Sequence, residues 1–234
     1  MTKRLFLIPA LLLLLLTGCK KFAGLGLQED TQHHPYLLDP HVKMNAWQYL
    51  RHRSGGDNAP GADSVLYLMY QAVLYSGIDT NEYTKTDRTF IFLHNLAVIN
   101  YTATVPIVPS SACYWGYYTV TDPTGDTIRP AKSWSDYTPA QVKSWLQYLI
   151  VQGTYSYDNL TPTEVTVNTL LPPGTDTLNP KSIMVLERVK TSDGKIRINN
   201  FVNSSNYVEV RTGGILTTNG PVHVVDQCVV YKLL

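Results

Sequence analysis

The pattern of apolar and polar positions changes near the middle of the chain. In the first half, apolar residues recur three and four positions apart, a spacing that predicts helices with one buried face. The helices predicted in this way cover residues 41–53, 63–78 and 138–150. Beyond Gly153 the apolar runs become short and are separated by turn residues, which predicts strands at residues 183–189, 195–199, 207–211 and 222–231. Helices gathered before strands are typical of an α+β domain rather than of alternating βα units.

The ends of these elements carry local signals. Thr138 followed by Pro139 and Gln141 is typical of a capped helix start, because the threonine and glutamine side chains bind free backbone N–H groups. Asp63 is the expected cap of the second helix. In the third helix, the apolar stripe that includes Trp145 predicts a contact with the core. The sequence also predicts two β-hairpin turns, Ser192-Asp193-Gly194 and Thr218-Asn219-Gly220.

The first residues follow the plan of a secretory signal. Lys3 and Arg4 precede an apolar run of about a dozen residues, which is shorter than the ~20 residues that a spanning helix requires. Leu16-Thr17-Gly18-Cys19 resembles a bacterial lipobox, which implies cleavage after residue 18 and lipid attachment at Cys19. The alternative is an ordinary secretory signal in which Cys19 is incidental. Residues 19–41 are expected to form a tether, and Lys20-Lys21 weakly favours the outer over the inner membrane.

The amino-acid composition excludes some classes of function. The chain holds 19 basic and 18 acidic residues, so it lacks the clustered positive charge that a nucleic-acid-binding surface requires. An apolar fraction of 44% supports a packed core, and without an internal repeat we expect one domain, over residues 42–234. Besides Cys19 the chain holds Cys113 and Cys228. The sequence leaves open whether these two pair as a disulfide or stay as buried thiols.

The C-terminal half resembles a known family. Its segments GKIRIN, GGI and NGPVHVVD, within residues 194–226, follow the order and spacing of the second conserved block of fasciclin-like (FAS1) domains. Residues 145–153 are similar to the family's LLxYHVVPG motif, and residues 65–78 lie where the family has a helix. The resemblance covers about residues 42–234. It implies a β-sandwich core flanked by N-terminal helices, in a fold used for interactions.

Two departures limit what the resemblance implies. The family's first block is kept only in part at residues 89–98, and Leu149 replaces the histidine that follows the tyrosine of the Tyr-His pair. A function of that pair therefore does not transfer. An insertion rich in Tyr and Pro, at about residues 101–137, separates the blocks. Three tripeptides are similar to O-glycosylation acceptors of Bacteroidetes and favour that phylum as the source; they lie at residues 63–65, 126–128 and 176–178.

The sequence predicts neither an enzyme nor a metal or cofactor site. His94 or His223 could in principle pair with a serine and Asp226, but His223 lies at a position that the resemblance marks as structural. Acidic residues in loops lie beside turn residues, where they usually form turn hydrogen bonds. Three histidines of the tether lack a carboxylate or cysteine that would complete a ligand set: His33, His34 and His41.

Aromatic residues are dense in and beside the insertion. The candidate binding residues are Tyr114, Trp115, Tyr117, Tyr118 and Trp134, with Tyr137 nearby. If exposed, their rings would offer flat contact surfaces to a sugar or a protein. If folded back, the same rings would cover the core, and the sequence does not decide between these arrangements.

The sequence therefore predicts a lipoprotein of the cell envelope, at the outer membrane, that acts without catalysis in adhesion or recognition. Its expected partners are the membrane, through the lipid, and a protein or polysaccharide ligand bound by the insertion. The alternative is an accessory glycan-binding lipoprotein of an outer-membrane polysaccharide-uptake system, which the aromatic residues suggest.

Overall fold

Two units divide the chain, residues 1–39 and residues 40–234. The computed structural model describes residues 21–22, 25–26, 40–56, 62–122, 124–190, 194–201 and 207–230. In the first unit, β1 (Lys21–Phe22) pairs antiparallel with β2 (Leu25–Gly26). The predictions for the signal residues, Cys19, His33 and His34 lie outside the described residues, as does most of the Ser192-Asp193-Gly194 turn.

The helices of the second unit begin and end at capping residues. They are α2 (Ala46–Arg53), α3 (Tyr67–Ser76), α4 (Asn95–Val98), α5 (Tyr114–Tyr117) and α6 (Pro139–Tyr148), with 3-10 turns η1 (Thr80–Tyr83) and η2 (Trp134–Asp136). The predicted capping box of Thr138 and Gln141 is confirmed at α6, and Asn45 forms a second box with Gln48 at α2. Gly77 ends α3 in the left-handed conformation, which glycine adopts without a steric penalty.

Two helix boundaries differ from the prediction. The Asp63 carboxylate pairs with Arg53 at 2.6 Å instead of capping a helix, so α3 begins only at Tyr67. Helix α6 ends before Ile150, which begins strand β6. Ile150 is fully buried. Periodicity alone cannot distinguish a buried helix end from a short buried strand.

The strands form one curved sheet. They are β3 (Arg88–Leu93), β6 (Ile150–Gln152), β7 (Val165–Asn168), β8 (Ile183–Arg188), β9 (Ile196–Ile198), β10 (Val208–Thr217) and β11 (Gly220–Val225). Their order is β6-β3-β11-β10-β9-β8-β7, and only the β3–β11 pair is parallel. At the two edges Val151 pairs with Thr169, and the Leu170 amide donates to the Ile150 carbonyl oxygen at 2.8 Å. The strands expected to form a sandwich thus form a single sheet whose edges meet.

Strand β11 lies between β3 and β10 and is buried from residue 221 to residue 225. Its turn to β10 consists of Thr218 and Asn219, one residue before the predicted Asn-Gly pair. Gly220 allows the close approach to β3, since a Cβ atom there would overlap the Arg88 carbonyl oxygen. His41, predicted to belong to the tether, pairs with Leu216 of β10 and therefore belongs to the domain.

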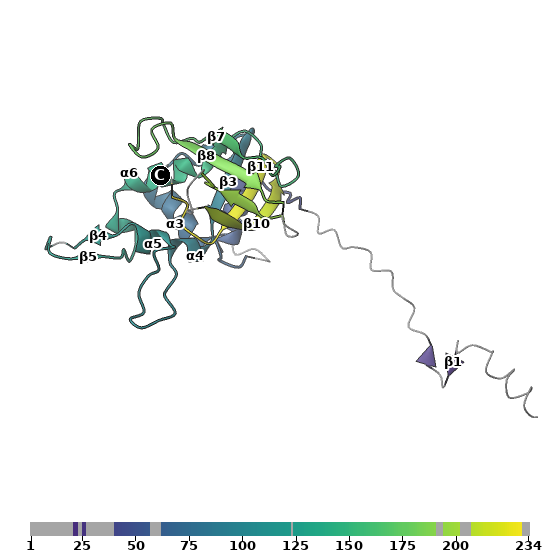
Figure 1. Ribbon diagram of the computed structural model, residues 1–234, viewed down its shortest axis with the longest axis horizontal. Helices are drawn as coiled ribbons and strands as arrows, with labels where there is room; N and C mark the ends of the chain where they lie inside the picture. The colour runs from purple at the N-terminus through teal and green to yellow at the C-terminus, as the bar shows by residue number, and fades with distance from the viewer. Residues whose placement is uncertain are drawn as a thin grey trace, which may run out of the picture. The chain divides into compact units, whose positions relative to one another are not determined.

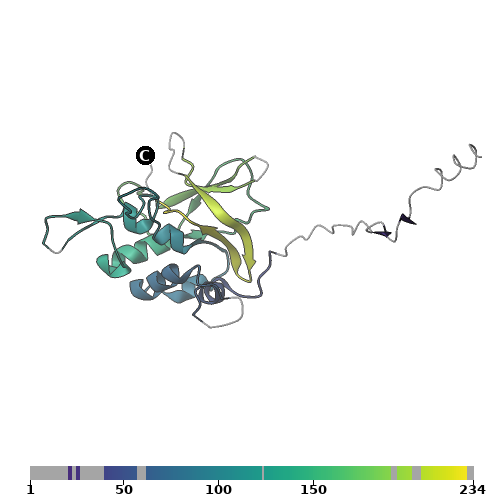
Figure 2. The same cartoon turned by 90° about the horizontal axis from the view of Figure 1, so that it is seen from below.

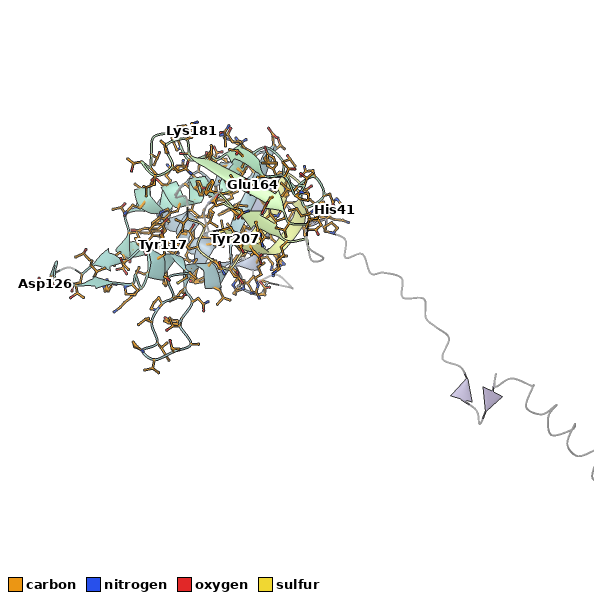
Figure 3. All side chains as sticks on the ribbon, in the orientation of Figure 1. His41, Tyr117, Asp126, Glu164, Lys181 and Tyr207 are labelled. Carbon is orange, nitrogen blue, oxygen red and sulfur yellow. The ribbon has the colours of Figure 1, made fainter. Side chains whose placement is uncertain are left out.

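The three longer helices pack on one side of the sheet (Figures 1 and 2). The insertion adds α5, η2 and a hairpin of β4 (Val120–Thr121) and β5 (Ile128–Arg129). Two of its parts extend from the body: the loop between α4 and α5, and the β4–β5 hairpin, at whose far end Asp126 lies (Figures 1 and 3).

Candidate functional site

The aromatic residues of the insertion form a buried cluster. Tyr114, Trp115 and Trp134 are only 1%, 7% and 6% exposed. Their rings pack against each other and against Trp145 of α6, with the Tyr114 and Trp145 centroids 5.6 Å apart. The Trp134 indole N–H donates to the Leu68 carbonyl oxygen at 2.8 Å, which ties η2 to α3. Of the two arrangements that the sequence leaves open, the structure has the one in which these rings cover helices of the core, and a binding role of Tyr114, Trp115 and Trp134 stays a prediction.

Tyr117 and Tyr118 are partly buried beside this cluster (Figure 3 labels Tyr117). The Tyr118 ring stacks on Trp145 with centroids 4.5 Å apart, and Tyr117 packs edge-on against Tyr118 at 4.8 Å. The Tyr137 hydroxyl donates to the Tyr118 carbonyl oxygen at 2.6 Å. These contacts give both residues a structural role, and a contact of their exposed edges with a ligand stays a prediction.

Cys113 and Cys228 are buried free thiols. The Cys228 amide donates to the Ala112 carbonyl oxygen at 2.8 Å, so the chain after β11 runs beside the start of α5. The Cys113 thiol donates to the Ser110 carbonyl oxygen at 3.0 Å. Burial raises the pKa of the Cys228 thiol well above its usual value, which makes this thiol a poor nucleophile.

The histidine of the family-like block is enclosed by the protein. His223 is fully buried, its Nε2 atom lies 2.8 Å from the Tyr155 carbonyl oxygen, and its Nδ1 atom accepts the Gly214 N–H at 3.2 Å. Burial lowers the pKa of His223 to about 4, so the ring is neutral and Nε2 carries its proton. Asp226 pairs with Arg211 instead, at 3.1 Å. Both ring nitrogens form hydrogen bonds with backbone groups, and neither is placed to act as a general base.

Two asparagines of the same block also join distant segments. Asn199 lies with its Oδ1 atom 3.1 Å from the Tyr148 hydroxyl, and its Nδ2 atom donates to the Val230 carbonyl oxygen at 2.7 Å. The Asn219 side chain accepts the Ala46 N–H at 2.8 Å and donates to the Tyr83 carbonyl oxygen at 3.0 Å. These residues connect the sheet to α6, α2 and η1.

Apart from Ile128 of β5, which is 73% exposed, the large exposed apolar side chains described in the insertion lie on the loop of residues 101–109. Val105 and Ile107, at its end, are 90% and 68% exposed, and Tyr101 at its base is 56% exposed. The base is closed by backbone pairing of Tyr101 with Pro109. We call residues 104–108 the loop tip. It presents apolar side chains to solvent on a segment that extends from the body (Figure 1).

An open groove of about 340 Å³ lies beside this loop. It runs between the base of the loop and the chain after β5, and its lining is Ile99, Tyr101, Val108, Pro109, Arg129, Pro130, Ala131 and Lys132. Most of this lining is apolar. Arg129 and Lys132 add positive charge, although Arg129 also pairs with Asp136 at 3.1 Å.

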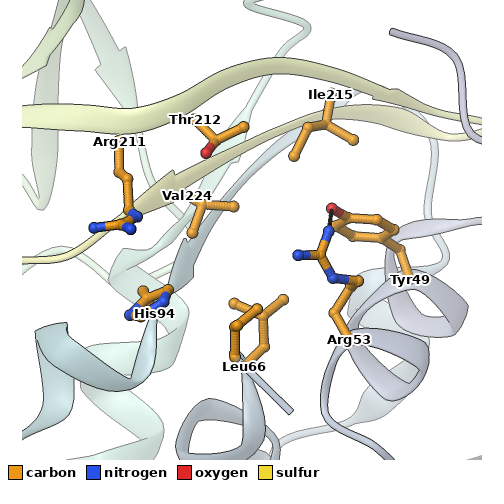
Figure 4. Close-up of a pocket in the computed structure, with 9 residues that line it drawn as sticks. Tyr49, Arg53, Leu66, His94, Arg211, Thr212, Ile215 and Val224 are labelled. Atoms are coloured by element: carbon orange, nitrogen blue, oxygen red, sulfur yellow. Dashed lines mark hydrogen bonds between the residues drawn. The ribbon is translucent and has the colours of Figure 1, made fainter. Parts of the chain in front are cut away.

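A smaller pocket of about 200 Å³ lies between the helices and β10 (Figure 4). Residues from five segments line it: Tyr49 and Arg53 of α2, Val65 and Leu66 before α3, His94 before α4, Arg211, Thr212 and Ile215 of β10, and Val224 of β11. The β10 residues lie where its register with β11 shifts twice, between Val210 and Ile215. Such irregularities turn side chains away from their regular alternation.

The polar groups of this pocket are held by hydrogen bonds. The Arg53 guanidinium donates to both Asp63 carboxylate oxygens, at 3.0 and 2.6 Å, and to the Tyr49 hydroxyl at 2.9 Å. The His94 Nδ1 atom accepts the Leu96 N–H at 3.1 Å, which caps α4. Burial, and then the positive charge of Arg211, lower the pKa of His94. The ring is therefore neutral near pH 7, with its proton on Nε2.

This pocket could not be predicted from the sequence. Arg53 and Arg211 stand in elements that are far apart in the chain, and no short motif links them. Within the described ranges there is no group of three or more His, Cys, Asp or Glu residues that could hold a metal ion. The described part of the chain also contains no helix that is long and apolar enough to cross a membrane.

The likeness of this chain to known proteins is structural. No protein-family model matches the chain, and no curated protein matches it. Among solved structures the chain is similar to a FAS1 domain pair from the insect cell adhesion molecule Fasciclin I, with 13% sequence identity and a TM-score of 0.43. The likeness covers 70% of this chain and 45% of that one, so the chain spans less than half the length of the solved relative.

Proposed function

We propose that this chain is a fasciclin-like lipoprotein of the cell envelope that binds a protein partner without catalysis, through the loop tip and the groove beside it. The lipobox-like residues that end at Cys19 support the anchor, at the outer membrane. The segments that resemble the fasciclin block support the family, since His223, Asn199 and Asn219 have structural roles in the sheet at those positions.

The observation that carries the proposal is the exposure of the loop tip. Single exposed apolar residues are ordinary on protein surfaces. Here Val105 and Ile107 stand two residues apart on a projecting loop, within residues 89–121, which contain no Asp, Glu, Lys or Arg. An apolar cluster that is kept in water on an extended segment marks a contact site.

The groove favours a protein partner over a bilayer or a glycan. A concave apolar groove of about 340 Å³ can receive a side chain from a partner, whereas a fluid bilayer has no fixed side chain to place there. Positive charge from Lys132 at the edge of the groove favours acidic residues on the partner. The glycan-binding alternative loses its main support, because the rings of Tyr114, Trp115 and Trp134 are buried.

The proposal predicts that the double variant Val105→Ser, Ile107→Ser loses partner binding and keeps its thermal stability. Both side chains are exposed, so their removal costs little folding free energy but takes away the apolar contact. Binding of the immobilised domain to envelope proteins, and to a polysaccharide panel, is measured by biolayer interferometry. The matched control is Leu74→Ser, Leu178→Ser, which removes apolar side chains of 53% and 46% exposure elsewhere.

Two results would contradict the proposal. One is envelope-protein binding that the tip variant and the control variant reduce equally. The other is binding to polysaccharides alone, which would support the glycan-binding alternative.

A further inference from the structure

The 200 Å³ pocket between α2, β10 and β11 combines hydrogen-bond donors with aliphatic walls. We propose that it binds the carboxylate of a small aliphatic ligand, in the form that the C-terminal residue of a peptide presents. The carboxylate would lie between the Arg53 and Arg211 guanidinium groups, and the aliphatic part would pack against Leu66, Ile215 and Val224 (Figure 4). The inference is independent of the loop tip and of its partner.

The side chains that line the pocket offer more hydrogen-bond donors than acceptors. Among the residues that the structure describes, Arg211 makes one hydrogen bond, from Nη1 to Asp226. Its side chain is 48% exposed, so most of its five N–H groups can reach a ligand. The Nε2–H of His94 has no acceptor among the residues that the structure describes. Thr212 points its hydroxyl into the pocket from above (Figure 4). A ligand that only accepts hydrogen bonds satisfies these groups best.

Positively charged groups face the pocket. Both guanidinium groups line the pocket, whereas the carboxylates that pair with them, Asp63 and Asp226, do not. In Figure 4 the two arginines approach the same space from opposite sides, with His94 between Arg211 and Leu66. Guanidinium groups suit carboxylates because their planar N–H groups match the two oxygens. The local field therefore favours an anion.

The size and the walls of the pocket suit a small aliphatic ligand. About 200 Å³ exceeds the ~150 Å³ cavity that accepts benzene, and it is smaller than the roughly 300–1,000 Å³ of pockets for drug-sized ligands. The walls beside the donors are aliphatic. The phenol ring in the lining, that of Tyr49, is 6% exposed and stacks on Phe92, so it offers no free face to a sugar. An aliphatic body fits these walls better than a pyranose ring does.

The test uses N-acetyl-L-leucine as the probe, with N-acetyl-L-leucinamide as its uncharged counterpart and D-glucuronate as a sugar carboxylate. Binding to the purified protein is measured by calorimetry and by NMR shifts of the His94 ring. We expect saturable binding of N-acetyl-L-leucine and a dissociation constant that is at least about tenfold larger for the amide. Arg211→Gln should weaken binding of the acid by a similar factor, because it removes the guanidinium with the most free N–H groups.

The matched control is Arg197→Gln, which breaks another pair of an arginine with a carboxylate, that of Arg197 and Glu209, outside both the pocket and the groove. It should leave the affinity for N-acetyl-L-leucine unchanged. If Arg211→Gln fails to fold, Arg211→Lys is tested in its place. Lysine keeps the positive charge but lacks the planar pair of N–H groups that matches a carboxylate, so we expect the affinity for N-acetyl-L-leucine to fall by at least about threefold.

Equal affinity for the acid and the amide, or equal loss of affinity in the Arg211 and Arg197 variants, would overturn the inference. Tighter binding of D-glucuronate than of N-acetyl-L-leucine would also overturn it in favour of a glycan carboxylate.

Discussion

The imidazole of His223 is enclosed between β10, β11 and the loop after β6, where a positive charge would have no water around it. Its two hydrogen bonds suit only the neutral ring, because Nδ1 must accept the Gly214 N–H while Nε2 donates to Tyr155. Protonation at Nδ1 would break the first bond and bury a charge. His223, one of two histidines that could in principle pair with a serine and Asp226, is therefore a link between backbone segments.

Acidification is expected to destabilise the fold through His223. Its pKa is about 4 in the folded protein, below the ordinary value of 6.5, so the unfolded chain binds more protons between these values. The contribution of His223 is fully present above about pH 6.5 and is lost as pH falls towards about 4. Urea unfolding should show a loss of roughly 2 kcal/mol between about pH 7 and pH 5.

The control for this pH effect is His223→Gln, in which the loss between these pH values should largely disappear. An unchanged loss in the variant would assign the effect to other groups.

At the residue scale, the sequence predicts which residues are structural better than it predicts sites. Asn219 and His223 stand in a recognisable block, and both make structural hydrogen bonds. The pocket could not be predicted, because Arg53 and Arg211 come together only when α2 packs beside the irregular part of β10. The exposure of Val105 could not be predicted either, since an apolar residue in a sequence is ordinarily expected to lie in the core.

At the element scale, local signals predicted helices well and strand pairing poorly. Helices α2 and α6 end near their predicted positions because caps and glycines act within a few residues. The sequence analysis does not predict β3, β6 and β7. The neighbours of β3 and β6 in the sheet are distant in the chain, and β7 is only four residues long. The aromatic insertion shows the same limit. Its density of rings could not reveal that they turn inward onto α3 and α6.

Replacement of Trp134 tests the structural role of the insertion. Trp134 is 6% exposed, contacts Trp115 and Trp145, and donates to Leu68, so Trp134→Ala leaves a cavity and removes the hydrogen bond to the Leu68 carbonyl oxygen. We expect a loss of about 3–5 kcal/mol in the free energy of unfolding and a melting temperature lower by at least about 6 °C.

The control in the same insertion is Tyr101→Ala, whose side chain is 56% exposed and whose loss should change the free energy of unfolding by less than about 0.5 kcal/mol. Similar melting temperatures for the Trp134 and Tyr101 variants would show that the insertion is peripheral to the fold.

At the scale of the whole molecule, the two contact sites proposed above lie on different parts of one domain. The sheet supports the 200 Å³ pocket through β10 and β11, and the insertion carries the loop tip between α4 and α5. Neither place depends on a reaction. Both sites would suit the anchored protein proposed above, since anchoring would raise the effective concentration for weak contacts.

The anchor itself is tested by Cys19→Ser, which removes the sulfur that would receive the lipid. A single acyl chain gives only marginal membrane binding, whereas several chains hold a protein firmly, because each buried CH₂ group contributes about 0.8 kcal/mol. We expect the variant to move from the membrane fraction to the soluble fraction and to incorporate no labelled palmitate. Cys113→Ser, which removes a buried thiol outside the lipobox-like residues, should stay in the membrane fraction and keep its label. Equal palmitate incorporation in the Cys19 variant would exclude Cys19 as the lipid site, and retention of an unlabelled variant would require a different anchor.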